Sequence, residues 1–88
     1  MVRRRVIVRG RVQGVGFRVS VASRAGGRGI GGWVRNRPDG AVEAVFEGRP
    51  EDVEALVDYV REGPRGAAVE HVEIADEEPE VLGRFEIW

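Results

Sequence analysis

The sequence predicts an α+β fold of the split β-α-β type, in which two helices cover one face of a mainly antiparallel sheet. Two observations predict it. Short alternating apolar runs, typical of strands, are interrupted by two segments with helical periodicity, and the order is β-α-β-β-α-β plus a short terminal strand. No internal repeat, low-complexity tract or linker divides the chain. We therefore expect a single domain over residues 1–88, which buries roughly 60–65% of its unfolded surface.

The first half of the chain supplies a strand, a helix and a second strand. Residues 3–10 place two valines two positions apart, as expected of a strand with one buried face. A helical pattern begins at Phe17 and stops at Gly26 and Gly27. Its β-branched residues and glycines have low helix propensity, so this helix needs tertiary packing to persist. Residues 30–36 predict the second strand.

The second half supplies a hairpin partner, a helix and two more strands. The turn sequence Arg-Pro-Asp-Gly at 37–40 precedes alternation over residues 41–47, so the second and third strands form a β-hairpin. Residues 50–62 predict the clearest helix, with Pro at its first position, acids in its first turn and Gly after its end. Residues 69–75 predict a fourth strand, and residues 85–87 predict a short final one.

The residue types that are absent restrict the possible chemistry. The chain has no Cys and no Lys, which excludes disulfides, thiolate metal sites, Schiff bases and lysine-containing phosphate loops. The single histidine, His71, cannot build a multi-histidine metal site. Ser20 or Ser23 could pair with His71 as a nucleophile, but no Gly-x-Ser-x-Gly sequence surrounds either serine. An enzyme of this composition works through arginine, main-chain N–H groups, amides and water.

The chain also lacks the features of a membrane or exported protein. No apolar run approaches the roughly 18 residues that span a bilayer. The basic residues 3–5 are followed by too few apolar residues for a signal peptide. We therefore expect a cytoplasmic protein. The absence of Cys and the scarcity of Asn, Gln and Met also suggest a thermophilic source, which a melting temperature above the mesophilic range would support.

Charge is divided unevenly along the chain. Residues 1–40 hold ten arginines and one acid, a net charge of +9, while residues 41–88 hold four arginines and fourteen acids, a net charge of −10. One interpretation is that the two halves interleave in the fold and pair on its surface. The other is that the first half builds a positive field around an anion site.

Residues 10–18, Gly-Arg-Val-Gln-Gly-Val-Gly-Phe-Arg, carry the strongest functional signal. Three glycines follow the first strand, and glycine lets main-chain N–H groups turn toward a ligand with no Cβ in the way. The helix that starts next adds unpaired N–H groups and the positive end of its dipole. Arg18 lies in the first helical turn, where a cation is disfavoured unless an anion joins it. This motif predicts a phosphate or carboxylate site.

Asn36 is predicted to lie beside this loop. The first helix returns the chain, so the first and second strands run parallel, and their C-terminal ends share one rim of the sheet with the start of the helix. Arg18 and Asn36 both fall on that rim, where an amide can hold a water by donating and accepting at once. Taken singly, the glycine loop could be a structural turn, Arg18 a solvated charge and Asn36 a strand-end turn residue.

Other side chains receive structural interpretations. We expect Gln13 to hydrogen-bond within its own loop, Trp33 and Phe17 to lie in the core, and His71 to lie on an exposed strand face. Trp88, with its terminal carboxylate, could approach the arginine of the site.

The two motifs together resemble the signature of the acylphosphatase family. Residues 10–18 carry the first motif, and Gly-Trp-Val-Arg-Asn at 32–36 carries the second, followed by Gly40, Val42 and Gly48 at the family's spacing. The similarity covers essentially the whole chain and implies a ferredoxin-like fold. It also implies a small hydrolase that needs no metal and no cofactor. The chain departs from common members in the glycine-rich end of its first helix and in having a serine at position 20.

The resemblance further implies roles for individual residues. Arg18 corresponds to the substrate-binding arginine that clamps phosphoryl oxygens, and Asn36 to the asparagine that orients the attacking water. The backbone N–H groups of Val15, Gly16, Phe17 and Arg18 complete the phosphate cradle. The implied enzyme is an acylphosphatase, which hydrolyses the carboxyl-phosphate anhydride bond of a small-molecule acyl phosphate to carboxylate and inorganic phosphate.

Two other function classes stay open. A ferredoxin-like module can bind phosphate or nucleic acid on its sheet, although the chain has only six aromatic residues, no aromatic-rich strand motif and an acidic second half. A carbamoyl phosphate-handling domain, as found within the hydrogenase-maturation carbamoyltransferases, is the other class, but no zinc-binding or transferase segment accompanies it. We expect a free-standing monomeric enzyme that binds no nucleic acid and no membrane.

Overall fold

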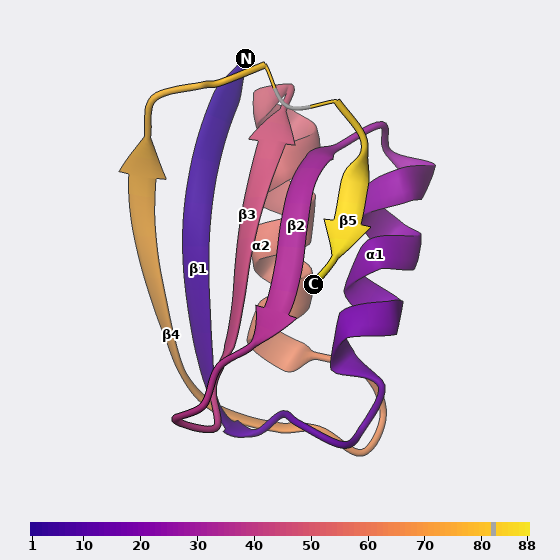
Figure 1. The fold of residues 1–88 in the computed structure, drawn as a ribbon, viewed down its shortest axis with the longest axis vertical. Helices are drawn as coiled ribbons and strands as arrows, with labels where there is room; N and C mark the ends of the chain where they lie inside the picture. Colours follow the sequence, from indigo (N-terminus) through magenta and orange to yellow (C-terminus); the bar gives the residue numbers. More distant parts are fainter. Residues whose placement is uncertain (82) are drawn as a thin grey trace.

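The computed structural model of the protein describes residues 1–81 and 83–88, which form two helices and a five-stranded sheet (Figure 1). The strand order across the sheet is β4-β1-β3-β2-β5. In chain order the elements are β1 (Val2–Arg11), α1 (Phe17–Gly27), β2 (Gly31–Asn36), β3 (Val42–Gly48), α2 (Pro50–Glu62), β4 (Ala68–Glu77) and β5 (Phe85–Ile87). The predicted element order and the ferredoxin-like α+β fold are confirmed.

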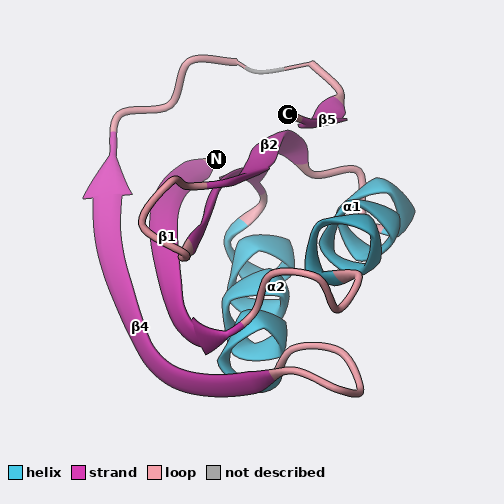
Figure 2. Cartoon of the chain, turned by 60° about the horizontal axis from the view of Figure 1, so that its bottom comes forward, coloured by secondary structure: helices cyan, strands magenta, loops and turns pink. Residues whose placement is uncertain are grey.

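The strand directions bring the ends of β1 and β2 to one rim. β3 pairs antiparallel with β1 and with β2, so β1 and β2 run parallel on either side of it. β4 is antiparallel to β1, and β5 pairs in parallel with β2. Both helices lie on the same face of the curved sheet (Figure 2). The start of α1 therefore lies at the rim where β1 and β2 end, as the β-α-β order predicts.

The core fills the space between the sheet and the helices. α2 contributes four residues at helical spacing that are at most 1% exposed: Val53, Leu56, Val57 and Val60. α1 contributes Phe17, Val21 and Ala25. The sheet contributes alternate residues of its central strands, among them Val6, Val8, Val34, Ala44 and Phe46. None of the helices described is long and apolar enough to cross a membrane.

β4 continues past residue 75, where the predicted strand ends. Arg3 and Arg5 of β1 each donate a hydrogen bond to the Glu77 carboxylate, with Nε–O distances of 2.8 and 2.6 Å. These cross-strand bonds continue the pairing with β1 to the end of β4. The acidic composition of this segment gives no sign of its arginine partners.

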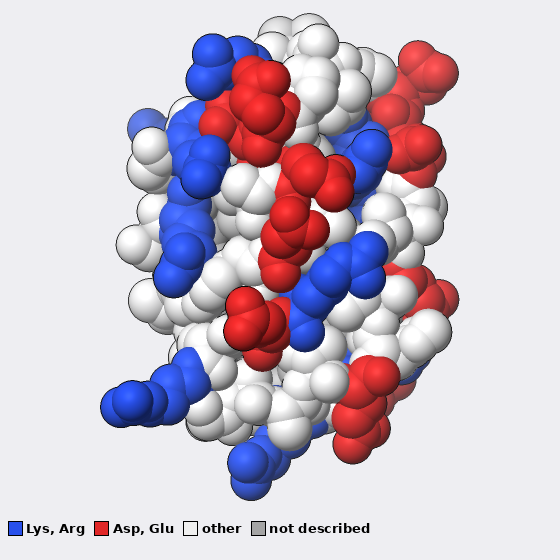
Figure 3. Space-filling view, turned by 180° about the vertical axis from the view of Figure 1, so that it is seen from behind, with Lys and Arg blue, Asp and Glu red and all other residues white. Residues whose placement is uncertain are grey.

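Ion pairs connect the basic first half of the chain with its acidic second half. Arg5 of β1 bonds both Glu43 of β3 and Glu77 of β4. Arg28, the residue that follows α1, bonds Asp52 of α2, with an N–O distance of 3.0 Å. Figure 3 shows the face that carries the helices, where basic and acidic side chains lie beside one another. The uneven charge along the sequence is thus largely paired within the fold.

Trp33 does not lie in the core, and that prediction is wrong. Val34 faces the helices and is fully buried, so strand alternation places Trp33 on the opposite face of the sheet. There the Trp33 ring is half-buried and stacks on Trp88, with ring centroids 4.4 Å apart and an interplanar angle of 8°. Phe17, in contrast, is buried as predicted, at 2% exposure.

Candidate active site

A pocket of about 100 Å³ lies where β1 and β2 end and α1 begins. Arg18 and Asn36 both line it, although they are far apart in the sequence. The other lining residues are Val12, Gly14, Gly16, Phe17 and Val19. The fold thus brings the two predicted side chains and the glycine loop to one place, at the end of the molecule that comes forward in Figure 2.

Two glycines of the loop adopt the left-handed backbone conformation. The φ angle is 76° at both Gly14 and Gly16, a region that residues with side chains rarely occupy. A Cβ added to either glycine would meet no protein atom within 4 Å. Glycine is therefore required for its backbone angles, and the space beside the loop is open to a ligand. Gly16 is also the N-cap residue, which directly precedes α1.

The first turn of α1 presents main-chain N–H groups that have no acceptor within the helix. The first helical hydrogen bond runs from the Ser20 N–H to the Gly16 oxygen, at 3.1 Å. The amides of Phe17, Arg18 and Val19 precede it and have no intrahelical partner. No side chain caps this end of the helix, and its first turn holds no acidic residue. These N–H groups and the helix dipole therefore favour an anion in the pocket.

Arg18 is held by the main chain of Trp88, the residue that follows the last strand. Its Nη1 donates to the main-chain oxygen of Trp88 at 3.1 Å, so Trp88 does approach the arginine. Trp88 is in turn fixed by its N–H, which donates to the Val34 oxygen at 2.8 Å, and by its stack on Trp33. Within the described residues no carboxylate side chain pairs with Arg18. The remaining guanidinium donors are available to a ligand.

Asn36 ends β2, and the turn that follows it is tied to the glycine loop. Strand alternation places Asn36 on the helix-facing side, as it does Val34 two residues earlier. Gln13 does not bond within its own loop, contrary to prediction. Its Nε2 donates to the main-chain oxygens of Arg37 and Ala41, at 2.8 and 3.0 Å. Gln13 therefore fixes the two halves of the site relative to each other.

Asp39 stabilises the same turn. Its Oδ1 accepts a hydrogen bond from the Ala41 N–H at 3.1 Å, and its Oδ2 pairs with Arg9 and Arg37. The Ala41 N–H, together with these two arginines, holds the pKa of the Asp39 carboxyl below its ordinary value. The carboxylate form that holds the turn is therefore favoured at neutral pH.

Of the four predicted cradle residues, Val15 does not line the pocket. Its side chain packs against the core, while Gly14 and Gly16 on either side of it line the pocket. The sequence did not single out Val12 or Val19, which also line it. Their closeness to the glycine loop in sequence was the available signal for them.

Two other features that could have formed a site, His71 and the groove between the helices, lie away from Arg18 and Asn36. His71 is exposed on the edge strand β4, as predicted. A groove of about 560 Å³ lies between α1 and α2, but neither Arg18 nor Asn36 lines it. Across residues 1–81 and 83–88, no three His, Cys, Asp or Glu side chains form a group that could hold a metal ion. The smaller pocket, with the volume of about three water molecules, suits a phosphoryl group.

Comparisons with known proteins find similar proteins over nearly the whole chain. A family model described as Acylphosphatase matches residues 4–87. A relative from Thermococcus kodakarensis, named Acylphosphatase, is 54% identical over 86 residues, which cover 98% of this chain and 94% of that protein. A relative of the same name from Gloeobacter violaceus is 52% identical over 86 residues, 98% of this chain and 92% of its own length.

Among solved structures, the crystal structure of acylphosphatase from Bacillus subtilis superposes with a TM-score of 0.96 at 39% sequence identity. The match covers 100% of this chain and 99% of that one. The resemblance therefore extends over the whole fold and includes the loop and both strands that form the pocket.

Proposed function

This chain belongs to the acylphosphatase family, and from that premise we propose that the pocket at the start of α1 is its active site. The protein is an acylphosphatase, which hydrolyses the carboxyl-phosphate anhydride bond of acyl phosphates to a carboxylate and inorganic phosphate. The observation that carries the site assignment is the presence of Arg18, Asn36 and the open glycine loop around one pocket.

Binding of the phosphoryl group comes first. The main-chain N–H groups of residues 15–18, which include the unpaired amides of Phe17 and Arg18 at the start of α1, donate to phosphoryl oxygens. The guanidinium of Arg18, with one Nη1 donor engaged by Trp88, offers its other donors to the same oxygens. Together they neutralise the charge that makes attack on a phosphate dianion slow.

Asn36 positions the water. Its carboxamide donates one hydrogen bond and accepts another, which fixes both the place and the orientation of the nucleophile. The water oxygen forms a bond to phosphorus, the bond from phosphorus to the acyl oxygen breaks, and the electron pair leaves with the carboxylate. The catalytic contribution is alignment, together with electrostatic stabilisation.

The leaving group explains why no strong acid is needed, since a carboxylate is stable when it departs. For the proton of the attacking water, we propose that an oxygen of the substrate phosphoryl group accepts it. Asn36→Asp would add a carboxylate base at this position. Slower turnover by this variant supports the proposal, and faster turnover contradicts it.

Hydrolysis of benzoyl phosphate in the presence of a metal chelator tests the assignment. We expect turnover by the wild-type protein, and a loss of about 10²- to 10³-fold in Arg18→Ala, because one preorganised donor to the transition state is removed. Unchanged turnover in a folded Arg18→Ala protein would remove Arg18 from the mechanism. Loss of wild-type turnover on chelation, restored by added metal, would contradict metal independence.

We further propose that residues 1–88 act as one domain, a cytoplasmic monomer that binds neither nucleic acid nor membranes. The pairing of many arginines with carboxylates supports the absence of nucleic-acid binding, because it leaves fewer basic groups for the phosphates of a nucleic acid. The RNA-binding and carbamoyl phosphate-handling alternatives are not favoured, since the family model described as Acylphosphatase matches residues 4–87 and relatives of that name are 52% and 54% identical to the chain. Salt-sensitive retention on immobilised RNA would contradict the proposal.

A further inference from the structure

We propose that Tyr59 and Ser20 are positioning residues, which orient the Arg18 main-chain N–H toward the phosphoryl group through a two-step hydrogen-bond relay. This inference rests on the proposed function, because it assumes that the Arg18 amide belongs to the phosphate cradle. It assigns a role to a side chain of α2, which contributes no residue to the pocket itself.

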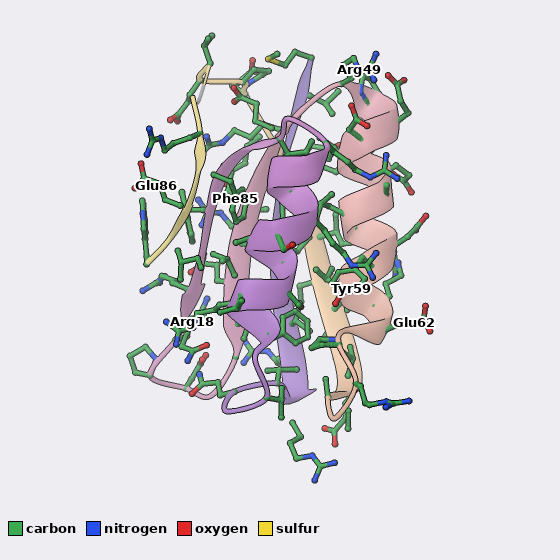
Figure 4. All side chains as sticks on the ribbon, turned by 90° about the vertical axis from the view of Figure 1, so that its right-hand side faces the viewer. Arg18, Arg49, Tyr59, Glu62, Phe85 and Glu86 are labelled. Carbon is green, nitrogen blue, oxygen red and sulfur yellow. The ribbon has the colours of Figure 1, made fainter. Side chains whose placement is uncertain are left out.

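The relay runs from α2 into the first turn of α1. The Tyr59 hydroxyl donates to Ser20 Oγ at 2.9 Å, and Ser20 Oγ donates to the main-chain oxygen of Phe17 at 3.1 Å. Tyr59 and Ser20 are half-buried, and Phe17 is buried. Figure 4 shows Tyr59 on α2 beside α1, with Arg18 on the other side of that helix. The relay therefore ends at the backbone of the predicted cradle.

The peptide unit between Phe17 and Arg18 links the relay to the Arg18 N–H. The Phe17 C=O and the Arg18 N–H belong to one planar trans peptide and point in opposite directions. Fixing the direction of the Phe17 oxygen therefore also fixes the direction of the Arg18 N–H, which points out of the helix start into the pocket. A hydrogen bond accepted by the oxygen also polarises the peptide, which strengthens its N–H as a donor.

The partners that start the relay are themselves held in place. The Arg24 guanidinium lies over the Tyr59 ring, 3.9 Å from its centroid, and keeps the ring between the helices. The Phe17 ring packs against Gly63 at the end of α2, where an added Cβ would lie 2.6 Å from Phe17 Cε2. Gly63, which follows α2, thus contacts the ring of Phe17, while Tyr59 of α2 is linked through Ser20 to the Phe17 carbonyl oxygen.

The test compares Tyr59→Phe and Ser20→Ala with the wild-type protein, with Ser23→Ala as the matched control. Tyr59→Phe keeps the ring under Arg24 and removes only the hydroxyl. Ser23 is exposed on the same helix, outside the relay. Two quantities are measured: the NMR chemical shift of the Arg18 amide in phosphate-free protein, and the dissociation constant for inorganic phosphate.

We expect both relay variants to shift the Arg18 amide resonance and to weaken phosphate binding by about two- to tenfold, the effect of one neutral hydrogen bond. The phosphate affinity of the double variant falls no further than that of either single variant, because both substitutions break the same hydrogen-bond relay. Ser23→Ala leaves both quantities at wild-type values. A lower melting temperature with an unchanged Arg18 resonance and unchanged phosphate affinity would overturn the proposal, since the link would then only join the helices.

The two proposals fail in different ways. If inorganic phosphate does not perturb the Arg18 amide of the wild-type protein, the cradle assignment is wrong. The relay is still judged by the phosphate-free resonance, which must move in Tyr59→Phe and Ser20→Ala. A resonance that stays in place in both variants overturns the relay, whatever the phosphate titration shows.

Discussion

The guanidinium of Arg18 donates to the main-chain oxygen of Trp88, 70 residues further along the chain, at 3.1 Å. One charged side chain in the first turn of α1 is thereby held by the residue that follows the last strand. The contact restrains a long side chain that would otherwise sample many rotamers, and it reduces the entropy lost when a phosphoryl group is clamped.

Trp88→Ala tests this restraint. The variant keeps a main-chain oxygen but loses the stack on Trp33, which is worth about 0.5–1.5 kcal/mol. We expect KM for an acyl phosphate to rise about two- to tenfold with a smaller change in kcat. Ile74→Ala, an exposed position on the edge strand β4, is the control. Steady-state kinetics with KM unchanged would show that Trp88 does not restrain Arg18.

Arg18→Lys separates charge from geometry. Lysine keeps the positive charge but loses the planar fork that binds two phosphoryl oxygens while also bonding Trp88. We expect kcat/KM to fall by about tenfold to 10²-fold, with the melting temperature little changed. Arg61→Lys, in the last turn of α2, serves as the comparison. Equal activity in Arg18→Lys would mean that charge alone suffices.

Gly16→Ala is expected to damage both fold and site. At a φ of 76° an alanine costs about 1–2 kcal/mol, and relief of that strain would move the amides at the start of α1. For Gly26→Ala we expect the opposite effect on stability, because Gly26 lies inside α1 with open space around it. There alanine should stabilise by about 0.5–1 kcal/mol. Thermal melts measure the stability of both variants, and phosphate titrations measure their affinity. A Gly16→Ala protein with wild-type melting temperature and phosphate affinity would contradict the account.

Stability should fall in acid through carboxylates such as Glu43. Burial raises the pKa of this carboxyl, but hydrogen bonds from Arg35 and Arg5 outweigh burial and leave the pKa below its ordinary value. A carboxyl with a lowered folded-state pKa stabilises the fold above its unfolded pKa, and this contribution is lost as pH falls through the folded pKa. We expect melting temperatures to drop progressively below about pH 5.

Glu43→Gln provides the control for that titration. This variant should melt lower at pH 7, because Arg35 loses its charged partner and Arg5 keeps only Glu77, and its melting temperature should depend less on pH. Parallel pH curves for variant and wild type would show that Glu43 does not contribute to the acid sensitivity.

The sequence predicts features that depend on local patterns. The apolar stripe of α2 fixes its bounds at residues 50–62, and the glycine loop and Asn36 converge because a β-α-β crossover leaves little choice of topology. Side-chain contacts between different elements of the fold do not follow from local patterns in the same way. Trp33 lies on the outer face rather than in the core, Gln13 bonds the β2–β3 turn, and Tyr59 meets Ser20 from 39 positions away. Strand alternation with the buried Val34 was the available signal for the outward side of Trp33. Propensity and periodicity carry no information about the partners of Gln13 and Tyr59.

The most direct test of the central claim is the split between turnover and phosphate affinity in Asn36→Ala. If Asn36 orients the attacking water while Arg18 and the loop bind phosphate, kcat for acetyl phosphate should fall about 10²- to 10³-fold. The dissociation constant for inorganic phosphate should stay within about twofold of the wild-type value. A folded Asn36→Ala protein that turns over at the wild-type rate would contradict the account.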